Sequence, residues 1–231
     1  MMVNKIPVHV AIIPDGNRRW AKEKGLGILK GVEKSAEFEN ITSLLDEASR
    51  LGIKYFSLWG FSTENWKRGE EEIAFIFNLI FKSINNLKEY AKNKKIKFRH
   101  IGRKDRLPKN VVKILGEFER DTERNNGLNV QFLLDYGGRD EIIRGVNKIL
   151  REGKKEINEK EFERYLDTKG IPDSDLIIRT GGEQRLSGLM SYQSSYAELY
   201  FTEIYFPDFD ASELKKAVEW FSNVKRRFGG D

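Results

Sequence analysis

Short apolar runs alternate along the chain with longer segments in which apolar residues recur at helical spacing. The runs rich in β-branched and aromatic residues predict strands at residues 9–13, 53–59, 96–102, 128–134, 175–180 and 198–203. The longer segments predict helices at residues 32–51, 70–92, 108–124, 139–151 and from 211 to about 228. Gly52 and Pro108 stand where a helix is expected to end and to begin.

This alternation of strands and helices predicts an α/β fold. Helical crossovers between successive strands favour a mostly parallel sheet with helices on both faces. No internal repeat, low-complexity tract or long linker divides the chain. We therefore expect residues 1–231 to form one domain around a six-stranded sheet.

Composition narrows the classes of protein that fit. A chain of 231 residues with 39% hydrophobic content can bury one substantial core. Its 41 basic and 36 acidic residues nearly balance, which argues against a nucleic-acid partner. With no cysteine the chain has no disulfides and no thiolate metal ligands, and the sequence favours a cytoplasmic protein. The longest apolar stretch, residues 73–81, is far shorter than the roughly 20 residues of a membrane span. Peripheral contact through the basic run at residues 92–100 stays open.

Polar residues follow three of the predicted strands. In an open parallel sheet ligands collect at the carboxyl ends of strands, so these loops are expected to share one edge. The first loop is the stretch after Ile13, with a carboxylate, a glycine and two arginines that suit phosphate oxygens. Taken alone it could be a common Asp-Gly turn with solvated arginines. The three loops together supply Asp15, Gly16, Arg18, Arg19, Ser62, Asn65, Arg68, Arg179, Gly181, Gly182, Arg185 and Ser187.

These loops offer enough cations and backbone donors for two polyanionic groups. Asp15 and Glu198 are the carboxylates that could hold Mg²⁺, which binds through one or two carboxylates together with substrate phosphates. The sequence therefore indicates a binding site for two polyanionic groups at which these carboxylates could supply oxygen ligands to Mg²⁺.

At this point the residues resemble a known family. The segments HVAIIPDGNRRWA, FSTENWKR with Glu72, YGGR, IIRTGGEQRLSG, YAELYFTEIYFPDF and RRFGG are similar to the successive motifs of cis-prenyltransferases, the undecaprenyl and dehydrodolichyl diphosphate synthase type. They occur in order from His9 to Gly230. The resemblance implies a hydrophobic tunnel beside the sheet, a homodimer and Mg²⁺-dependent condensation of an allylic prenyl diphosphate with isopentenyl diphosphate into a cis polyprenyl diphosphate.

The resemblance also implies roles for individual residues. Asp15 would hold Mg²⁺ and, with Asn65, be catalytic, while Glu198 would be a second metal-side carboxylate. The allylic diphosphate would be cradled by Gly16, Asn17, Arg18 and Arg19, with Trp20 beside them. The isopentenyl diphosphate would lie against Arg179, Arg185 and Ser187. A mobile segment carrying Asn65, Trp66, Arg68 and Glu72 would close over both substrates, and Ser62 before it would bind substrate. Arg227 and Gly229 would complete the neighbouring subunit's site. Trp20 and Trp66 could equally brace their loops.

The predicted helix at residues 70–92 is a candidate wall of the tunnel. Apolar residues between Ile73 and Ile84 are spread too widely for one core-facing stripe, so one face could pack on the sheet and the other line the tunnel. A central helix buried on two sides is the alternative explanation. His9 and His100 are better explained as structural histidines within strands.

Several positions depart from the family pattern. Ile28 and Val32 stand where an arginine and a histidine are usual, Gln184 replaces a histidine, and Asp135 replaces an asparagine. The absent cations are expected to weaken the hold on the allylic diphosphate by several kcal/mol unless other groups compensate. A prenyltransferase with an unusual acceptor, such as another prenyl diphosphate or an alcohol, is therefore an alternative function.

Other classes fit less well. A non-catalytic partner subunit of an active homologue is a further alternative, but the presence of Asp15, Asn65, Arg179, Arg185 and Glu198 argues against it. A trans-type prenyltransferase is disfavoured because the chain contains no DDxxD and is not all-helical. No Gly-x-Gly-x-x-Gly or Walker loop points to a nucleotide enzyme.

Overall fold

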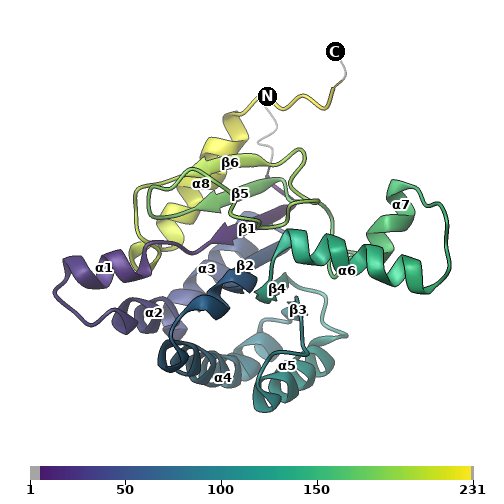
Figure 1. The fold of residues 1–231 in the computed structure, drawn as a ribbon. Helices are drawn as coiled ribbons and strands as arrows, with labels where there is room; N and C mark the ends of the chain where they lie inside the picture. The colour runs from purple at the N-terminus through teal and green to yellow at the C-terminus, as the bar shows by residue number, and fades with distance from the viewer. Residues whose placement is uncertain (1–5, 230–231) are drawn as a thin grey trace.

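The computed structural model describes residues 6–229, and Gly230, the end of the last motif, lies outside this range. Six strands form a single sheet: β1 (His9–Ile13), β2 (Tyr55–Ser62), β3 (Lys97–Ile101), β4 (Asn129–Tyr136), β5 (Leu176–Arg179) and β6 (Glu198–Phe201). Their order is β3-β4-β2-β1-β5-β6, and every neighbouring pair is parallel (Figure 1). The predicted α/β fold with a parallel six-stranded sheet is confirmed.

Eight α-helices connect and cover these strands in the described part of the chain. They are α1 (Asn17–Glu23), α2 (Leu29–Ser35), α3 (Phe38–Leu51), α4 (Glu70–Asn93), α5 (Lys109–Thr122), α6 (Gly138–Arg151), α7 (Glu159–Phe162) and α8 (Ala211–Asn223). Short 3₁₀ helices span Thr63–Lys67, Glu163–Tyr165 and Phe206–Asp208. The sequence did not predict α7 as a helix.

Two helix boundaries differ from the prediction. The segment expected as one helix over residues 32–51 is two, α2 and α3, because Glu37 adopts an extended backbone with ψ 140° and the helix must begin again. The last helix ends at Asn223 rather than near residue 228, since Val224 is extended with ψ 130°. Residues 224–229 therefore leave α8 as an extended arm, which we call the C-terminal arm.

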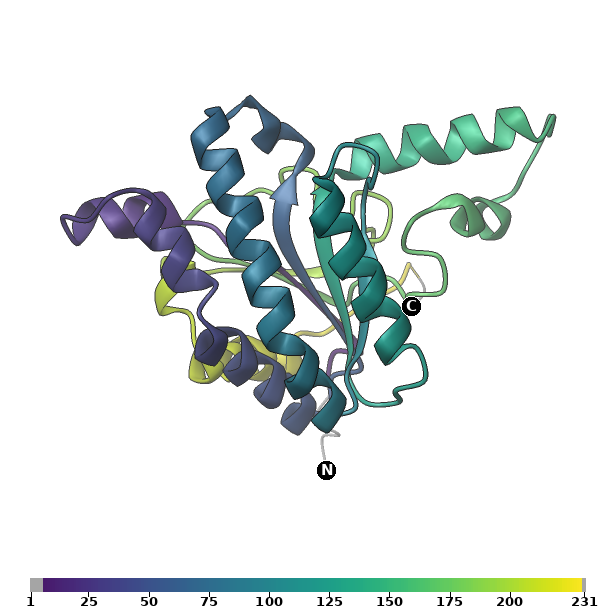
Figure 2. The same cartoon turned by 90° about the horizontal axis from the view of Figure 1, so that it is seen from below.

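The hydrophobic core lies on both faces of the sheet. The larger cluster joins strand residues such as Val10, Phe56 and Val130 to side chains of α3, α4, α5 and α8. A smaller cluster on the other face joins Ala11 and Leu133 to residues of the loop that follows β5. Figure 2 shows α4 running along the sheet, while α6 and α7 extend away from the body of the molecule. Within residues 6–229, no helix is both long enough and apolar enough to cross a bilayer.

This topology sets where the loops meet. Because all strands run in one direction, the loops that follow β1, β2, β4 and β5 leave from the same edge of the sheet. Residues that precede or begin a strand lie at the opposite, amino edge. Asp15 belongs to the first group and Glu198, the first residue of β6, belongs to the second.

Candidate active site

The loop after β1 is fixed to the loop after β5 at the carboxyl edge of the sheet. The backbone N–H of Asp15 donates to Thr180 Oγ1 at 2.9 Å, and the Thr180 hydroxyl donates back to the Asp15 carbonyl at 2.8 Å. The Phe206 N–H donates to the same carbonyl at 3.0 Å. Gly16 has φ 97°, and a side chain there would overlap the Tyr205 ring, so glycine is needed at this turn.

The Asp15 carboxylate is the centre of a charged cluster. Its Oδ2 accepts from Arg179 Nη2 at 2.9 Å, and its Oδ1 accepts from the Gly16 N–H at 2.6 Å. Arg19 Nη2 lies 3.3 Å from Oδ1. The carboxylate is 31% exposed, whereas the Arg179 side chain is only 5% exposed. Two guanidinium groups from different loops therefore converge on one accessible carboxylate.

Arg179 is held from the opposite side by its own loop. Its Nη1 donates to Ser187 Oγ at 2.8 Å and to the Arg185 carbonyl, while its buried Nε has no hydrogen-bond partner. Gly181 has φ 82°, and a Cβ there would lie 3.1 Å from the Asp15 carbonyl carbon and the Gly16 nitrogen, so glycine is favoured where this loop approaches the first. The structure thus brings Asp15, Arg19, Arg179 and Ser187 together, as the sequence predicted for residues at strand ends.

The Arg185 side chain does not join this cluster in the structure. Its guanidinium pairs with Glu183 and is 60% exposed, and only its carbonyl faces Arg179. Gln184 is also exposed, and nothing in the structure explains the replacement of a histidine there. The isopentenyl role of Arg185 would require its side chain to turn inward.

Glu72 links the first loop to the segment after β2. Its carboxylate lies 3.1 Å from Arg68 Nη1 and 4.0 Å from Arg18 Nη1. Asn65 Oδ1 accepts from the Ser62 N–H at 3.0 Å and so closes the 3₁₀ turn. Asn65 therefore stabilises its own loop through this hydrogen bond. Arg18 and Arg68 both pair with the Glu72 carboxylate.

Trp66 braces that segment against β4. Its indole N–H donates to Asp135 Oδ1 at 2.8 Å, and its ring lies 5.3 Å from both Phe61 and Phe77. Asp135 is fully buried and also pairs with Arg106, whose Nε lies 2.8 Å from Oδ2. The sequence did not predict a role for Arg106. Arg106 lies in the loop after the predicted strand at residues 96–102, at the same edge of the sheet as the other polar loops. This position could have identified it.

The predicted diphosphate cradle in α1 is tied to its neighbours. Asn17 Nδ2 donates to the Pro14 carbonyl at 3.1 Å, and Asn17 Oδ1 accepts from Ser35 Oγ at 2.5 Å. A Cβ on Gly31 would overlap the Asn17 carbonyl, so α1 and α2 touch there. Trp20 Nε1 donates to Asp208 Oδ2 at 2.9 Å, which fits its bracing role.

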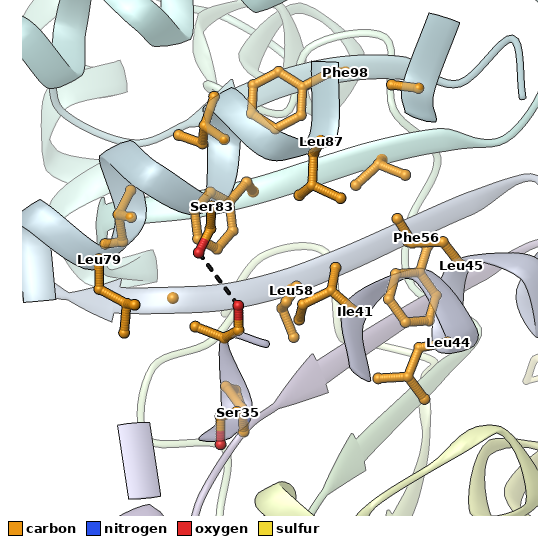
Figure 3. A pocket seen from close by; sticks show the side chains of 18 of the residues that line it. Ser35, Ile41, Leu44, Leu45, Phe56, Leu58, Leu79, Ser83, Leu87 and Phe98 are labelled. Carbon is orange, nitrogen blue, oxygen red and sulfur yellow. Dashed lines mark hydrogen bonds between the residues drawn. The ribbon is translucent and has the colours of Figure 1, made fainter. Parts of the chain in front are cut away.

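An apolar cavity of about 140 Å³ opens beside this edge of the sheet (Figure 3). Pro14, Asn17 and Ser35 line it near the polar loops, and Tyr90, Phe98 and Phe118 line it near the amino edge of the sheet. Helix α4 contributes Ile76, Leu79, Ile80, Ser83, Ile84 and Leu87, so one face of α4 forms a wall of this cavity. The Ser83 hydroxyl donates to the Ala36 carbonyl at 3.3 Å, joining α4 to the chain between α2 and α3.

Ile28 and Val32, the two departures in α2, have different surroundings. Ile28 is exposed at the start of the helix, and Val32 lines the cavity. Neither supplies a polar atom to the Asp15 cluster. Helix α2 contains no arginine or histidine that could take the place of the two cations in the family pattern.

Glu198 lies at the other edge of the sheet. It pairs in register with Leu176, three residues before Arg179, and its nearest cation is Arg226, with Nε 3.6 Å from Glu198 Oε1. Arg227 and Gly229 are exposed on the C-terminal arm near this edge. Glu198 and Asp15 of one chain therefore do not face a common metal site. Within residues 6–229 no three His, Asp or Glu side chains are grouped as metal ligands.

Comparisons with known proteins agree with this geometry. Residues 13–229 match the family described as "Putative undecaprenyl diphosphate synthase". The isoprenyl transferase of Thermotoga maritima is 43% identical over 230 residues, covering 98% of each chain. That of Fusobacterium nucleatum is 39% identical over 229 residues, covering 99% of this chain and 98% of the relative.

Two solved structures share the fold. Lavandulyl diphosphate synthase from Lavandula x intermedia, in complex with dimethylallyl diphosphate, superposes with a TM-score of 0.93 at 33% identity, covering 97% of this chain and 99% of that one. A probable undecaprenyl diphosphate synthase from Campylobacter jejuni gives a TM-score of 0.83 at 32% identity, covering 99% and 100%.

Proposed function

The chain belongs to the undecaprenyl diphosphate synthase family and is a prenyltransferase, and from this premise we propose that it condenses an allylic prenyl diphosphate with isopentenyl diphosphate. The product would be a cis polyprenyl diphosphate. One observation carries the proposal: Pro14 and Asn17, which flank the Asp15–Gly16 turn of the cationic cluster, line an apolar cavity. A charged head and an apolar chain on one substrate match such a site.

The arrangement of the cluster supports the binding of one diphosphate by the segment after β1 and of the other by the segment after β5. Arg18 and Arg19 lie in α1, which follows β1, and would receive the allylic diphosphate, whose chain would enter the cavity past Asn17. Arg179, with Ser187, belongs to the loop after β5 and would receive the isopentenyl diphosphate. Charge-assisted hydrogen bonds from each loop would stabilise the negative charge that develops as the allylic carbon–oxygen bond breaks.

The residues present fit Mg²⁺. Asp15 offers an accessible carboxylate beside the diphosphate loops, and Mg²⁺ is commonly held by one or two carboxylates with substrate phosphates. When bound, the ion would supply Lewis-acid stabilisation of the leaving diphosphate. Asp15 Oδ2 accepts one hydrogen bond, from Arg179, so this exposed carboxylate keeps lone pairs that could bind the ion.

We further propose a homodimer. On α6 the side chains of Ile143, Val146 and Leu150 are exposed at helical spacing, and Leu199 is exposed on the edge strand β6. A second copy covering these surfaces would bury apolar area and pair the free edge. Single-domain organisation over residues 1–231, a cytoplasmic location and peripheral membrane contact through the basic run at 92–100 belong to the same proposal.

A second candidate is transfer to an unusual acceptor. It is favoured by the high structural similarity to lavandulyl diphosphate synthase, whose product name differs from that of the undecaprenyl enzymes, and by the uncharged side chains at Ile28 and Val32. The non-catalytic alternative is weaker because Asp15, Arg19, Arg179 and Ser187 are assembled in one chain.

Purified protein would be incubated with Mg²⁺, labelled isopentenyl diphosphate and dimethylallyl, geranyl or farnesyl diphosphate. We expect labelled polyprenyl diphosphates whose formation stops when the metal is chelated. Product formed from an allylic diphosphate alone would favour the second candidate. No product with any primer would contradict both catalytic functions.

A further inference from the structure

Tyr205 lies against α1, the helix that carries the predicted diphosphate cradle. It belongs to the segment after β6 and directly precedes the 3₁₀ helix Phe206–Asp208. A Cβ on Gly16 would lie 2.3 Å from Cδ1 of the Tyr205 ring, so the ring is in contact with the turn that begins α1. The Tyr205 hydroxyl donates to Oε1 of Glu23, the last residue of α1, at 2.5 Å. One side chain therefore spans α1 from its N-cap to its last residue.

The same ring lies beside the Arg19 guanidinium. The guanidinium carbon Cζ is 5.5 Å from the Tyr205 ring centre, within the range of a cation–π contact. Arg19 and Glu23 are four residues apart in α1, so both lie on the side of the helix that faces the ring. Arg19 Nη2 lies 3.3 Å from Asp15 Oδ1, and Nη1 lies 3.8 Å from Glu183 Oε1. An aromatic ring and two carboxylates thus restrict a side chain that is 43% exposed.

Arg19 keeps its hydrogen-bond donors for a ligand. None of the residues between 6 and 229 accepts a hydrogen bond from its guanidinium, which is held by ion pairs and by the ring. Arg179, in contrast, donates to Asp15 and to Ser187. A cation–π contact is electrostatic and takes no N–H group of the cation as a conventional donor. The position of Arg19 is therefore restricted while its N–H groups can still bind phosphate oxygens.

The backbone beside Tyr205 keeps the ring in place. The Phe206 N–H donates to the Asp15 carbonyl at 3.0 Å, and Asp208 Oδ2 accepts from Trp20 Nε1 at 2.9 Å. The Phe206 side chain is buried in the larger core cluster. The ring therefore belongs to a segment that is bonded to the start of α1 at two points and anchored in the core. Such support from packed neighbours is what holds a binding group in one orientation.

We propose that Tyr205 is a positioning residue for the allylic diphosphate, because its ring holds the Gly16 turn and the Arg19 guanidinium in the orientation that receives phosphate oxygens. The inference rests on the proposed function, in which Arg19 belongs to the allylic site and Arg179 to the isopentenyl site. An arginine that is ordered beforehand loses less conformational freedom when its ligand binds, so affinity for the primer rises. Since the contacts of the ring are made with α1 and its N-cap, the effect should be confined to the allylic substrate.

The first test compares the two substrates. Tyr205→Leu should raise the KM for farnesyl diphosphate about fivefold, which corresponds to about 1 kcal/mol and to the loss of an exposed cation–π contact. The KM for isopentenyl diphosphate and the kcat should stay within about twofold of wild type. Tyr205→Phe keeps the ring and loses only the bond to Glu23, so its KM for the primer should match wild type. Equal increases for both substrates, or a defect in Tyr205→Phe as large as in Tyr205→Leu, would overturn the proposal.

Tyr165 provides a matched control. Lys154 Nζ lies 5.4 Å from its ring centre, and its hydroxyl donates to Glu152, which follows α6. Tyr165→Leu therefore removes the same two kinds of contact in the part of the molecule where α6 and α7 extend away from its body (Figure 2). Both KM values of this variant should be those of wild type. A primer defect equal to that of Tyr205→Leu would show that the effect does not depend on contact with Arg19.

The second test measures binding without catalysis. Isothermal titration with farnesyl diphosphate alone would compare wild type, Tyr205→Leu, Arg19→Met and the double variant, each shown to be folded by circular dichroism. Tyr205→Leu should raise the Kd about fivefold, but the double variant should bind no more weakly than Arg19→Met, because the ring acts through that guanidinium. Losses that add in the double variant would overturn the proposal. Tyr205→Met takes the place of Tyr205→Leu if the latter is unfolded. A wild type that binds farnesyl diphosphate but forms no product would contradict the proposed function, and the pattern of Kd values would still decide the role of Tyr205.

Discussion

Asp15→Asn tests whether one carboxylate serves both the fold and the reaction. The substitution preserves shape but removes the charge that faces Arg179 at 2.9 Å and Arg19 at 3.3 Å. Arg179 is 5% exposed, so it is left buried beside a neutral amide. Breaking a fully buried pair costs about 3–5 kcal/mol, and because Asp15 is 31% exposed we expect about 1–3 kcal/mol here.

Two assays distinguish the structural and catalytic effects. In urea unfolding, a loss of about 2 kcal/mol lowers the midpoint by roughly 1 M when the slope is about 2 kcal/mol per molar. Turnover with saturating Mg²⁺ should fall at least about a hundredfold, since loss of several kcal/mol of metal stabilisation exceeds two decades in rate. A circular dichroism spectrum would establish that the variant is folded. A folded variant with most of its turnover intact would refute the assignment of Asp15 to the metal.

Three other perturbations address stability, packing and primer binding. Burial lowers the pKa of His9 to about 4, so the neutral ring stabilises the fold above the unfolded pKa of about 6.5, and this stability is lost as pH falls towards 4. Between pH 7 and 5 the free energy of unfolding of His9→Gln, measured in urea, should fall by about 2 kcal/mol less than that of wild type. Equal falls in the two proteins would contradict this. Gly31→Ala should raise KM for the allylic primer and lower the melting temperature, because its Cβ would overlap the Asn17 carbonyl; unchanged kinetics would show that the α1–α2 contact does not shape the site. Ile28→Arg combined with Val32→His should lower KM for farnesyl diphosphate by adding cations near a polyanion, and an unchanged or higher KM in the folded variant would indicate neutral drift.

The periodicity of the chain was sufficient to predict the sheet and most of its helices. It could not predict the break between α2 and α3, because neither glycine nor proline marks Ala36 and Glu37, and the cause is the extended backbone of Glu37. It also could not show that α8 stops at Asn223, since the following apolar and basic residues continue a helical pattern. Tertiary contacts accompany both breaks, since Ser83 of α4 donates to the Ala36 carbonyl and Arg226 donates to Asp175.

The sequence could predict the candidate site only where the direction of the strands determines which residues meet. Asp15 and Arg179 follow the apolar residues of their strands, and a parallel sheet places both at one edge. Glu198 precedes the apolar residues of β6, so the same rule places it at the other edge. Within one chain Glu198 and Asp15 therefore do not meet, and the metal role of Glu198 stays a prediction. Side-chain partners such as Arg226 lie far away in sequence and become visible only in three dimensions.

The hydrogen-bond partners of Asp135 explain why an aspartate stands where an asparagine is usual. At φ 50° the residue adopts the left-handed backbone that both Asn and Asp tolerate, so the backbone does not choose between them. The choice is made by the partners: Trp66 donates to Oδ1, and Arg106 donates to both oxygens of the buried carboxylate. An asparagine could accept at only one oxygen and would turn its NH₂ group towards a guanidinium. A carboxylate therefore ties the loop after β3 to the segment that carries Asn65 and Arg68.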